Sequence, residues 1–304
     1  MALPQPQIAI NQPLILPVFE RYGYTVSIKR EDLVSPLALG NKWRKLKYNI
    51  EAFKQSKANG LLTFGGAYSN HLAATAALCA QEKIRCIGIV RGDELALKPL
   101  NPTLEKCQQN GMELVFISRE EYTRKEHGKT VQEVRQARGA LFLLPEGGTN
   151  ALAVKGCKEI LTPKDAIFDT ICCAVGTGGT LAGLALAAAP HQKVIGFQVV
   201  KDVAIQDRIR TFVSNNRWTI VPQAVSSKYA QVDASLVAFA TDIFHQTGVL
   251  LDPVYTAPML ARIVEMIKNK KWTFGKNMLL IHTGGTQSIA GFNLKHHQYQ
   301  WPNQ

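Results

Sequence analysis

The sequence lacks the patterns that mark several common classes of protein. Its six cysteines show no C-x-x-C spacing, which argues against a zinc site or a redox motif. Most of them lie in apolar segments, as is typical of buried thiols in a reducing compartment. The first residues lack the basic-then-apolar order of a signal peptide. We also find no internal repeat and no metal-site spacing. These absences predict a cytoplasmic protein of ordinary packed domains, without a metal.

A membrane or nucleic-acid partner is also disfavoured. One charge-free stretch, Ile171–Ala189, is nearly long enough to span a bilayer, but its four glycines favour a buried core. The net charge of +12 comes from 35 lysines and arginines against 23 acidic residues. These basic residues are spread along the chain, with no basic-aromatic repeat and no amphipathic basic helix. We therefore interpret the charge as nonspecific surface charge and expect neither partner.

The apolar runs predict two α/β units. Between residues 60 and 145 the pattern predicts strands at 61–64, 84–90, 114–117 and 141–144 and helices at 70–81, 102–110 and 130–138. A second block has expected strands at 167–175, 194–200 and 278–282 and expected helices at 181–189, 203–212, 234–246 and 257–269. The strand-like residues 24–29 are expected to pair with this second block. The sequence thus predicts a discontinuous large domain (1–44 and 146–304) and a small α/β domain (45–145), each with a mostly parallel sheet.

The most informative stretch is the glycine-rich turn at residues 176–180, between an expected strand and an expected helix. Such a turn offers free backbone N–H groups and the positive end of a helix dipole to an anion, most often a phosphate. A dinucleotide fingerprint fails because Leu181 stands where glycine is required. A Walker motif at Gly128-Lys129-Thr130 fails because position 123 is threonine, so we interpret that segment as an exposed loop. A tight turn without any ligand remains the alternative.

Two further segments strengthen the case for a ligand. A second glycine turn, Gly65-Gly66-Ala67-Tyr68-Ser69-Asn70-His71, also follows a strand and opens a helix, although simple capping by Ser69 and Asn70 would explain part of it. In the third segment, 40–46, Lys42 stands at the start of a helix, where the dipole lowers the pKa of an amine and so suits a Schiff base. For Arg44, Lys45 and Lys47 we expect a solvated helix face.

These segments together resemble the pyridoxal-phosphate enzymes of the 1-aminocyclopropane-1-carboxylate deaminase / D-cysteine desulfhydrase family. Further motifs of that family follow in its order over nearly the whole chain. They are Lys29–Asp32, Leu144–Asn150, Gly176–Thr180, Leu251–Thr256 and Ile281–Gly285. The resemblance implies the tryptophan-synthase-β-like fold (fold type II), a homodimer and pyridoxal 5'-phosphate as the cofactor.

The resemblance also implies roles for individual residues. Lys42 would hold the cofactor through a Schiff base, and Asn70 would bond the ring hydroxyl. Ser69 would contact the substrate carboxylate or assist proton transfer, while Tyr255 and Tyr229 would face the substrate, with half-buried packing as the alternative for both. The remaining implied contacts are to the cofactor from Gly176, Thr177, Gly178, Gly179, Thr180 and Thr283, and to the substrate from Asn41, Tyr68 and His71.

Two positions bear on the reaction. Deaminases of the family resemble one another in carrying Glu and Leu where this sequence has Thr256 and Thr283. A hydroxyl beside the pyridine nitrogen makes the ring a weaker electron sink than a glutamate does, which suits elimination of sulfide better than cyclopropane opening. We therefore expect a lyase that converts D-cysteine to pyruvate, ammonia and hydrogen sulfide.

The sequence leaves several alternatives open. One is 1-aminocyclopropane-1-carboxylate deaminase activity, and another is elimination from D-serine or a related D-amino acid. A non-catalytic cofactor carrier is an alternative of a different class. Tyr68 stands where family members often carry Gln, so the substrate preference could differ.

Overall fold

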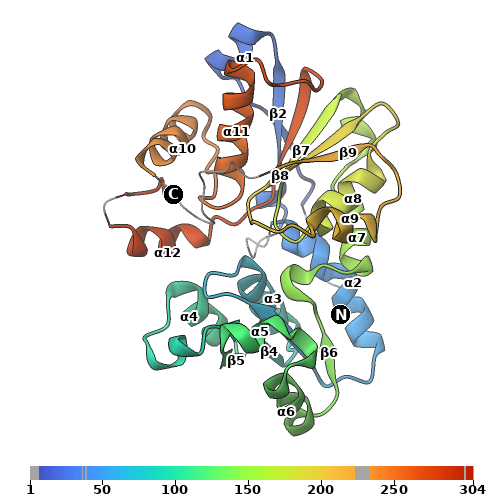
Figure 1. Cartoon of the computed structure of the whole chain (residues 1–304), viewed down its shortest axis with the longest axis vertical. Coiled ribbons are helices and arrows are strands. Elements are labelled where there is room, and N and C mark those ends of the chain that lie inside the picture. Colours follow the sequence, from blue (N-terminus) through green and yellow to red (C-terminus); the bar gives the residue numbers. More distant parts are fainter. Residues whose placement is uncertain (1–6, 36, 38–39, 223–232, 298, 304) are drawn as a thin grey trace.

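The chain folds around two β-sheets that lie one above the other, with helices around each (Figure 1). The computed structural model describes residues 7–35, 37, 40–222, 233–297 and 299–303. Within these residues no helix is long and apolar enough to cross a membrane. The two-sheet α/β architecture predicted from the sequence is confirmed.

The larger sheet has six strands and is parallel apart from one edge. Its spatial order is β1 (Asn11–Pro13), β2 (Thr25–Arg30), β10 (Asn277–His282), β7 (Thr170–Val175), β8 (Lys193–Gln198) and β9 (Trp218–Val221). Only β1 runs antiparallel to its neighbour. β2 pairs in parallel with β10, so the predicted pairing of the N-terminal strand with the second block is confirmed.

The smaller sheet has four strands, all parallel. Their spatial order is β5 (Met112–Ile117), β4 (Cys86–Arg91), β3 (Gly60–Gly65) and β6 (Leu141–Leu143). The helices that belong with this sheet are α3 (Asn70–Glu82), α4 (Pro102–Gln109), α5 (Arg119–Thr123) and α6 (Lys129–Arg138). The start of α6 corrects the loop expected at Gly128–Thr130, because Gly128 is the N-cap of this helix. The domain boundaries near residues 44 and 146 stay a prediction.

The remaining helices surround the larger sheet or lie between the two sheets. They are α1 (Pro17–Tyr22), α2 (Asn41–Gln55), α7 (Ala151–Lys158), α8 (Gly179–Ala187), α9 (Ile205–Arg210), α10 (Ala234–Thr247), α11 (Thr256–Lys268) and α12 (Ser288–Lys295). α7 packs closely on α2, because Gly156 has no side chain: a Cβ there would lie 1.8 Å from the carbonyl oxygen of Arg44. This contact fixes α2 against the larger domain.

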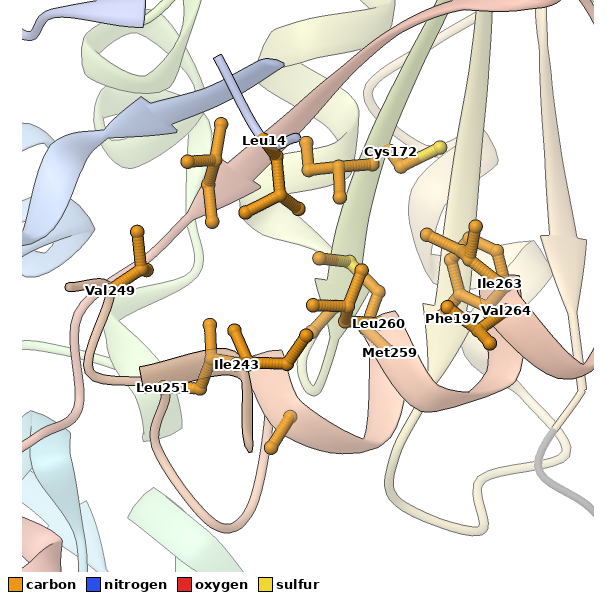
Figure 2. Close-up of a cluster of buried hydrophobic side chains, with 14 of the residues drawn as sticks. Leu14, Cys172, Phe197, Ile243, Val249, Leu251, Met259, Leu260, Ile263 and Val264 are labelled. Carbon is orange, nitrogen blue, oxygen red and sulfur yellow. The ribbon is translucent and has the colours of Figure 1, made fainter. Parts of the chain in front are cut away.

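A core of buried apolar side chains lies between the larger sheet and α11. Leu260 and Ile263 of α11 face Cys172 of β7 and Phe197 of β8, and all four are almost completely buried (Figure 2). The apolar positions of α11 recur at helical spacing, so burying one face of this helix against the sheet removes a large apolar area from water. The core holds rigid the strands that carry the site.

The ends of three strands set the location of the site. β3 ends at Gly65 and continues into Gly66, β7 is followed by Gly176 and Gly178, and β10 by Gly284 and Gly285. In parallel sheets ligands bind at the carboxyl ends of the strands, where the loops converge. These three glycine segments line one cavity between the two sheets.

Candidate active site

Lys42 lies at the start of α2, directly against the turn that follows β10. The helix begins after Gly40, which has a φ of +51°, and a Cβ at Gly40 would lie 2.3 Å from the carbonyl oxygen of Thr283. The Asn41 N–H donates to that same oxygen at 3.1 Å. Glycine is therefore required at position 40, and the contact fixes the first turn of α2 over the end of β10.

The local environment makes the Lys42 amine nucleophilic. Burial lowers its pKa to about 7, and the nearby positive charge of Lys45 contributes to this shift. The amine donates to Asn41 Oδ1 at 3.1 Å, and the Asn41 amide donates to the Thr180 hydroxyl at 2.8 Å. A lysine with a pKa near neutrality is partly unprotonated, as attack on an aldehyde requires. Asn41 thus links the lysine to the glycine turn of residues 176–180.

That turn has the geometry of an anion site. It lies between β7 and α8, so the first N–H groups of α8 point toward the cavity. Gly178 has a φ of +87°, which favours glycine. A Cβ at Gly179 would lie 2.9 Å from the Thr149 hydroxyl and 3.3 Å from Lys45 Nζ. The Thr149 hydroxyl and the Lys45 ammonium, which come from other segments of the chain, thus both lie close to the turn at Gly179.

Lys45 is a site residue that the sequence analysis placed wrongly. It was expected on a solvated helix face, but only 3% of it is exposed. Its ammonium donates to the Gly147 carbonyl at 3.0 Å and to the hydroxyls of Thr149 and Thr177 at 3.0 and 3.4 Å. No ion pair with a carboxylate is found for it among the described residues. A buried cation of this kind needs an anion, and a phosphate on the 176–180 turn would supply one.

Arg44 is also buried, for a different reason. Its guanidinium makes two hydrogen bonds of 3.0 Å to Glu31, a carboxylate that is completely buried. Lys47 is partly exposed and pairs with Glu159 at 2.9 Å. The expected solvated face is therefore wrong for Arg44 and Lys45, whereas Lys47 keeps contact with solvent. Arg44 helps to fix α2, and only Lys45 reaches the cavity.

The start of α3 brings Ser69 and Asn70 to the opposite wall of the cavity. The Ser69 hydroxyl accepts the Leu72 N–H at 3.2 Å, so the expected capping role is confirmed, and its own proton stays available to a ligand. Asn70 Oδ1 is buried and finds no partner among the described residues. The Asn70 amide faces Gly285, where a Cβ would lie 2.9 Å from Nδ2. An unsatisfied buried amide facing the cavity fits a polar ligand such as the ring hydroxyl of the cofactor.

His71 is a neutral, buried imidazole on the cavity wall. Thr63 donates its proton to the Leu144 carbonyl, so we assign His71 Nε2, 2.7 Å from the Thr63 oxygen, as the donor to it. Nδ1 then carries a lone pair and has no partner among the described residues. Burial, with the charges of Lys42 and Lys45, holds the pKa of His71 well below its usual value. His71 can accept a proton in a hydrogen bond but does not carry a charge.

The wall at the start of α11 holds Tyr255. A Cβ at Gly176 would lie 3.4 Å from Cε1 and 3.8 Å from the hydroxyl of this tyrosine, so the ring lies over the 176–180 turn. Thr283 also lines the cavity and is half-buried. Thr256 is completely buried, and its hydroxyl donates to Asp252 Oδ2 at 2.5 Å and accepts from the Asp252 N–H at 3.0 Å. Thr283, and not Thr256, is thus in a position to meet a ligand.

The last expected substrate contacts are Tyr68 and Tyr229. Tyr68 is 44% exposed and lies against α12, where a Cβ at Gly291 would be 3.1 Å from its ring. This contact joins the small domain to the large one at the edge of the cavity. Tyr229 lies outside the described residues. The substrate roles expected for Asn41, Tyr68, Ser69, His71, Tyr229 and Tyr255 stay predictions.

The cavity that these residues line has a volume of about 1260 Å³. Among the described residues, its walls carry eight lysines and arginines but three acidic residues. The acidic residues are Glu126, Glu146 and Asp202, and none of them comes from the segments that hold Lys42, Asn70 or Thr283. Such a cavity fits an anionic ligand with an aldehyde and a polar ring substituent. The residues present therefore fit pyridoxal phosphate, and the fold and the site together define a pyridoxal-phosphate enzyme of fold type II.

The comparison with known families agrees with this class. A family model described as "Pyridoxal-phosphate dependent enzyme" matches residues 8–284, so the chain belongs to that family.

Its relatives identify the branch of the family more closely. A Thermotoga maritima protein named "Putative 1-aminocyclopropane-1-carboxylate deaminase" is 33% identical over 88% of this chain and 90% of its own length. An Arabidopsis thaliana "Bifunctional D-cysteine desulfhydrase/1-aminocyclopropane-1-carboxylate deaminase, mitochondrial" is 29% identical over 86% of this chain and 73% of its own length. The "D-cysteine desulfhydrase" of Serratia proteamaculans is 26% identical over 89% of each chain. The resemblance stated from the sequence motifs is thereby confirmed.

A solved structure shows the same fold. The crystal structure of an "ACC deaminase homologue" superposes with a TM-score of 0.85 at 23% identity, covering 98% of this chain and 95% of that one. Maize serine racemase superposes with a TM-score of 0.67 at 17% identity, covering 97% and 94%. The expected fold class is confirmed.

Proposed function

We propose that the chain is a pyridoxal-phosphate-dependent lyase that eliminates sulfide from D-cysteine to give pyruvate, ammonia and hydrogen sulfide. The observation that carries the proposal is the pairing of Lys42, a partly buried amine with a pKa lowered to about 7, with a glycine turn that lies against the buried cation of Lys45. When bound, pyridoxal phosphate supplies an electron sink for the carbanion that forms at the substrate α-carbon. The protein has to place the substrate and move its protons.

The described residues support a division of these tasks. The Ser69 hydroxyl and the N-terminus of α3 would bind the substrate carboxylate, since both line the cavity and the Ser69 hydroxyl keeps a proton to donate. Lys42 would remove the α-proton, since an amine with a pKa of about 7 is a base near neutral pH. Tyr255 lies over the 176–180 turn and would border the substrate from that side.

The cavity wall near Thr283 supports elimination over cyclopropane opening. No acidic residue from the 252–256 or 283–287 segments lines the cavity, and the proton of the Thr256 hydroxyl is donated to Asp252. A pyridine nitrogen bound beside Thr283 would therefore have a hydroxyl, not a carboxylate, as its neighbour. Without a carboxylate the nitrogen is harder to keep protonated, and a weaker electron sink still suffices when the leaving group is good.

The test is an assay of the purified, cofactor-loaded protein on D-cysteine, L-cysteine, D-serine, β-chloro-D-alanine and 1-aminocyclopropane-1-carboxylate, with sulfide, pyruvate and 2-oxobutanoate as readouts. We expect sulfide and pyruvate from D-cysteine at a rate well above that of 2-oxobutanoate formation. The deaminase named among the relatives is the alternative, and dominant 2-oxobutanoate formation would establish it. A yellow protein that turns over none of these substrates would instead be the non-catalytic carrier.

We further propose that the enzyme is a homodimer in the cytoplasm. All six cysteines are free and buried, as expected in a reducing compartment. The dimer is an expectation from the family resemblance, and light scattering of the loaded protein would test it. A monomeric mass at assay concentration would contradict it.

A further inference from the structure

The outer part of the cavity carries more positive charge than the cofactor and a substrate carboxylate need. Three of its cations are neutralised by ion pairs: Arg119 with Glu94 at 2.6 Å, Arg208 with Asp202 at 2.6 Å, and Lys125 with Glu146 at 3.0 Å. Arg91, Lys201 and Lys295 also line the cavity, and no ion pair is found for any of these three among the described residues. Of the three, Arg91 is the exposed last residue of β4, and its guanidinium lies beside Gly66.

Arg91 lies beside the turn that begins the substrate side of the cavity. Its Nη2 atom is 3.5 Å from the position that a Cβ at Gly66 would take. The Gly66 carbonyl accepts the Ser69 N–H at 3.1 Å, so Arg91 and Ser69 flank a single turn of the backbone. Because Gly66 has no side chain, nothing from this residue covers the guanidinium on its cavity side.

The other neighbours hold Arg91 in place without neutralising it. The guanidinium carbon lies 5.7 Å from the centre of the Tyr122 ring, within the range of a cation–π contact. The Tyr122 hydroxyl donates to Glu146 at 2.7 Å, and that carboxylate is already paired with Lys125. Arg91 is therefore a cation without a paired carboxylate among the described residues. It is separated by the 66–69 turn from Ser69, the residue expected to bind the substrate carboxylate.

We propose that Arg91 forms a subsite for a second negative group, carried on the side chain of the amino acid. A guanidinium presents paired N–H donors, and a carboxylate, sulfonate or phosphate each offers two neighbouring oxygens that can accept from them. The subsite extends the substrate class from D-cysteine to small amino acids with an anionic β-substituent. This inference rests on the proposed function, because it assumes that the amino-acid carboxylate binds at Ser69.

The experiment compares ligands that differ only in side-chain charge. The loaded enzyme is titrated with D-aspartate and with D-asparagine, its neutral isostere, and binding is followed by the absorbance of the cofactor. Cysteate and O-phosphoserine, both as D-isomers, then separate sulfonate and phosphate from carboxylate. We expect D-aspartate to bind about fivefold more tightly than D-asparagine, the upper end for a partly solvated ion pair.

Variants assign the preference to one residue. Arg91→Gln should bring the ratio of the two affinities close to one, and Arg91→Lys should keep part of it. Arg119→Gln is the matched control, because Arg119 also lines the cavity but is paired with Glu94, and it should keep the full preference.

Equal binding of both ligands by the parent, or an unchanged preference in Arg91→Gln, would overturn the subsite. The two proposals fail separately: loss of the charge preference leaves sulfide release from D-cysteine intact, whereas absence of sulfide release leaves the measured preference standing. If no amino acid changed the spectrum, both would be contradicted.

Discussion

Replacing Lys45 by methionine should weaken cofactor binding without weakening the apo-protein. The ammonium is buried among three neutral oxygens and has no carboxylate partner among the described residues, so it is poorly compensated until a phosphate arrives. A hydrogen bond to a charged group contributes about 1.5–3 kcal/mol, which corresponds to about a 10- to 150-fold loss of affinity for pyridoxal phosphate. Methionine keeps the unbranched shape of the side chain.

The stability of the apo-protein should change little. Thr149 and Thr177 remain bonded to each other at 2.6 Å when Lys45 is removed, so only the Gly147 carbonyl loses its partner. That loss of about 1 kcal/mol is offset because the variant no longer buries a charge whose pKa is lowered by desolvation. We expect the free energy of unfolding of the apo-variant to lie within about 1 kcal/mol of the parent.

The assays are a cofactor titration and denaturant unfolding of the apo-protein. Lys47→Met is the control, because Lys47 lies on the same helix but pairs with Glu159 away from the cavity, and it should leave cofactor affinity unchanged. The reasoning is refuted if Lys45→Met binds the cofactor as tightly as the parent, since the phosphate would then lie elsewhere. A large loss of apo stability with unchanged affinity would make Lys45 purely structural.

Three further predictions follow from single contacts. The stability of the apo-protein should rise between about pH 7 and pH 10.5, because folding lowers the pKa of Lys42 from 10.5 to about 7 and the unfolded chain then binds more protons. Denaturant unfolding at several pH values tests this, and the stability of Lys42→Met should rise less steeply with pH. Gly178→Ala should lose cofactor affinity, because φ is +87° and a Cβ would lie 2.7 Å from Ile209; affinity equal to the parent would remove the turn from the site. Gly291→Ala should gain up to about 1 kcal/mol of stability from helix propensity. It should nevertheless raise the KM for D-cysteine, because its Cβ would lie 3.1 Å from the Tyr68 ring and would displace it. An unchanged KM would show that Tyr68 does not border the substrate.

The sequence predicts the backbone of the site better than its charges. The glycine turns at 65–66 and 176–179 are visible because a strand, a glycine pair and a helix follow one another locally, whereas the turn at 284–285 was found only through the family resemblance. Lys45 was missed because a charged residue in an amphipathic pattern is normally assigned to solvent. One signal was available: Lys42 and Lys45 are three residues apart, so they share one face of the helix.

Contacts between distant segments were not predictable in this way. Arg44 is buried by Glu31, from the segment after β2, and Tyr68 meets Gly291 across the two domains. Neither pair has a local pattern that could reveal it. The Thr256 hydroxyl was expected beside the ring nitrogen, but it is completely buried and donates its proton to Asp252. The start of β7 was predicted three residues early, because residues 163–167 form a 3-10 helix that only its capping box at Thr162 announces.

The central claim is that Lys42 carries the cofactor, and borohydride reduction followed by peptide mass spectrometry tests it most directly. Reduction fixes pyridoxal phosphate to whichever lysine holds it. The partly buried Lys42 and the buried Lys45 both line the cavity, and of these two Lys42 combines a pKa of about 7 with a place at the start of α2. The account predicts that the added mass lies on Lys42 alone. A label on Lys45, or on any other lysine, would contradict it.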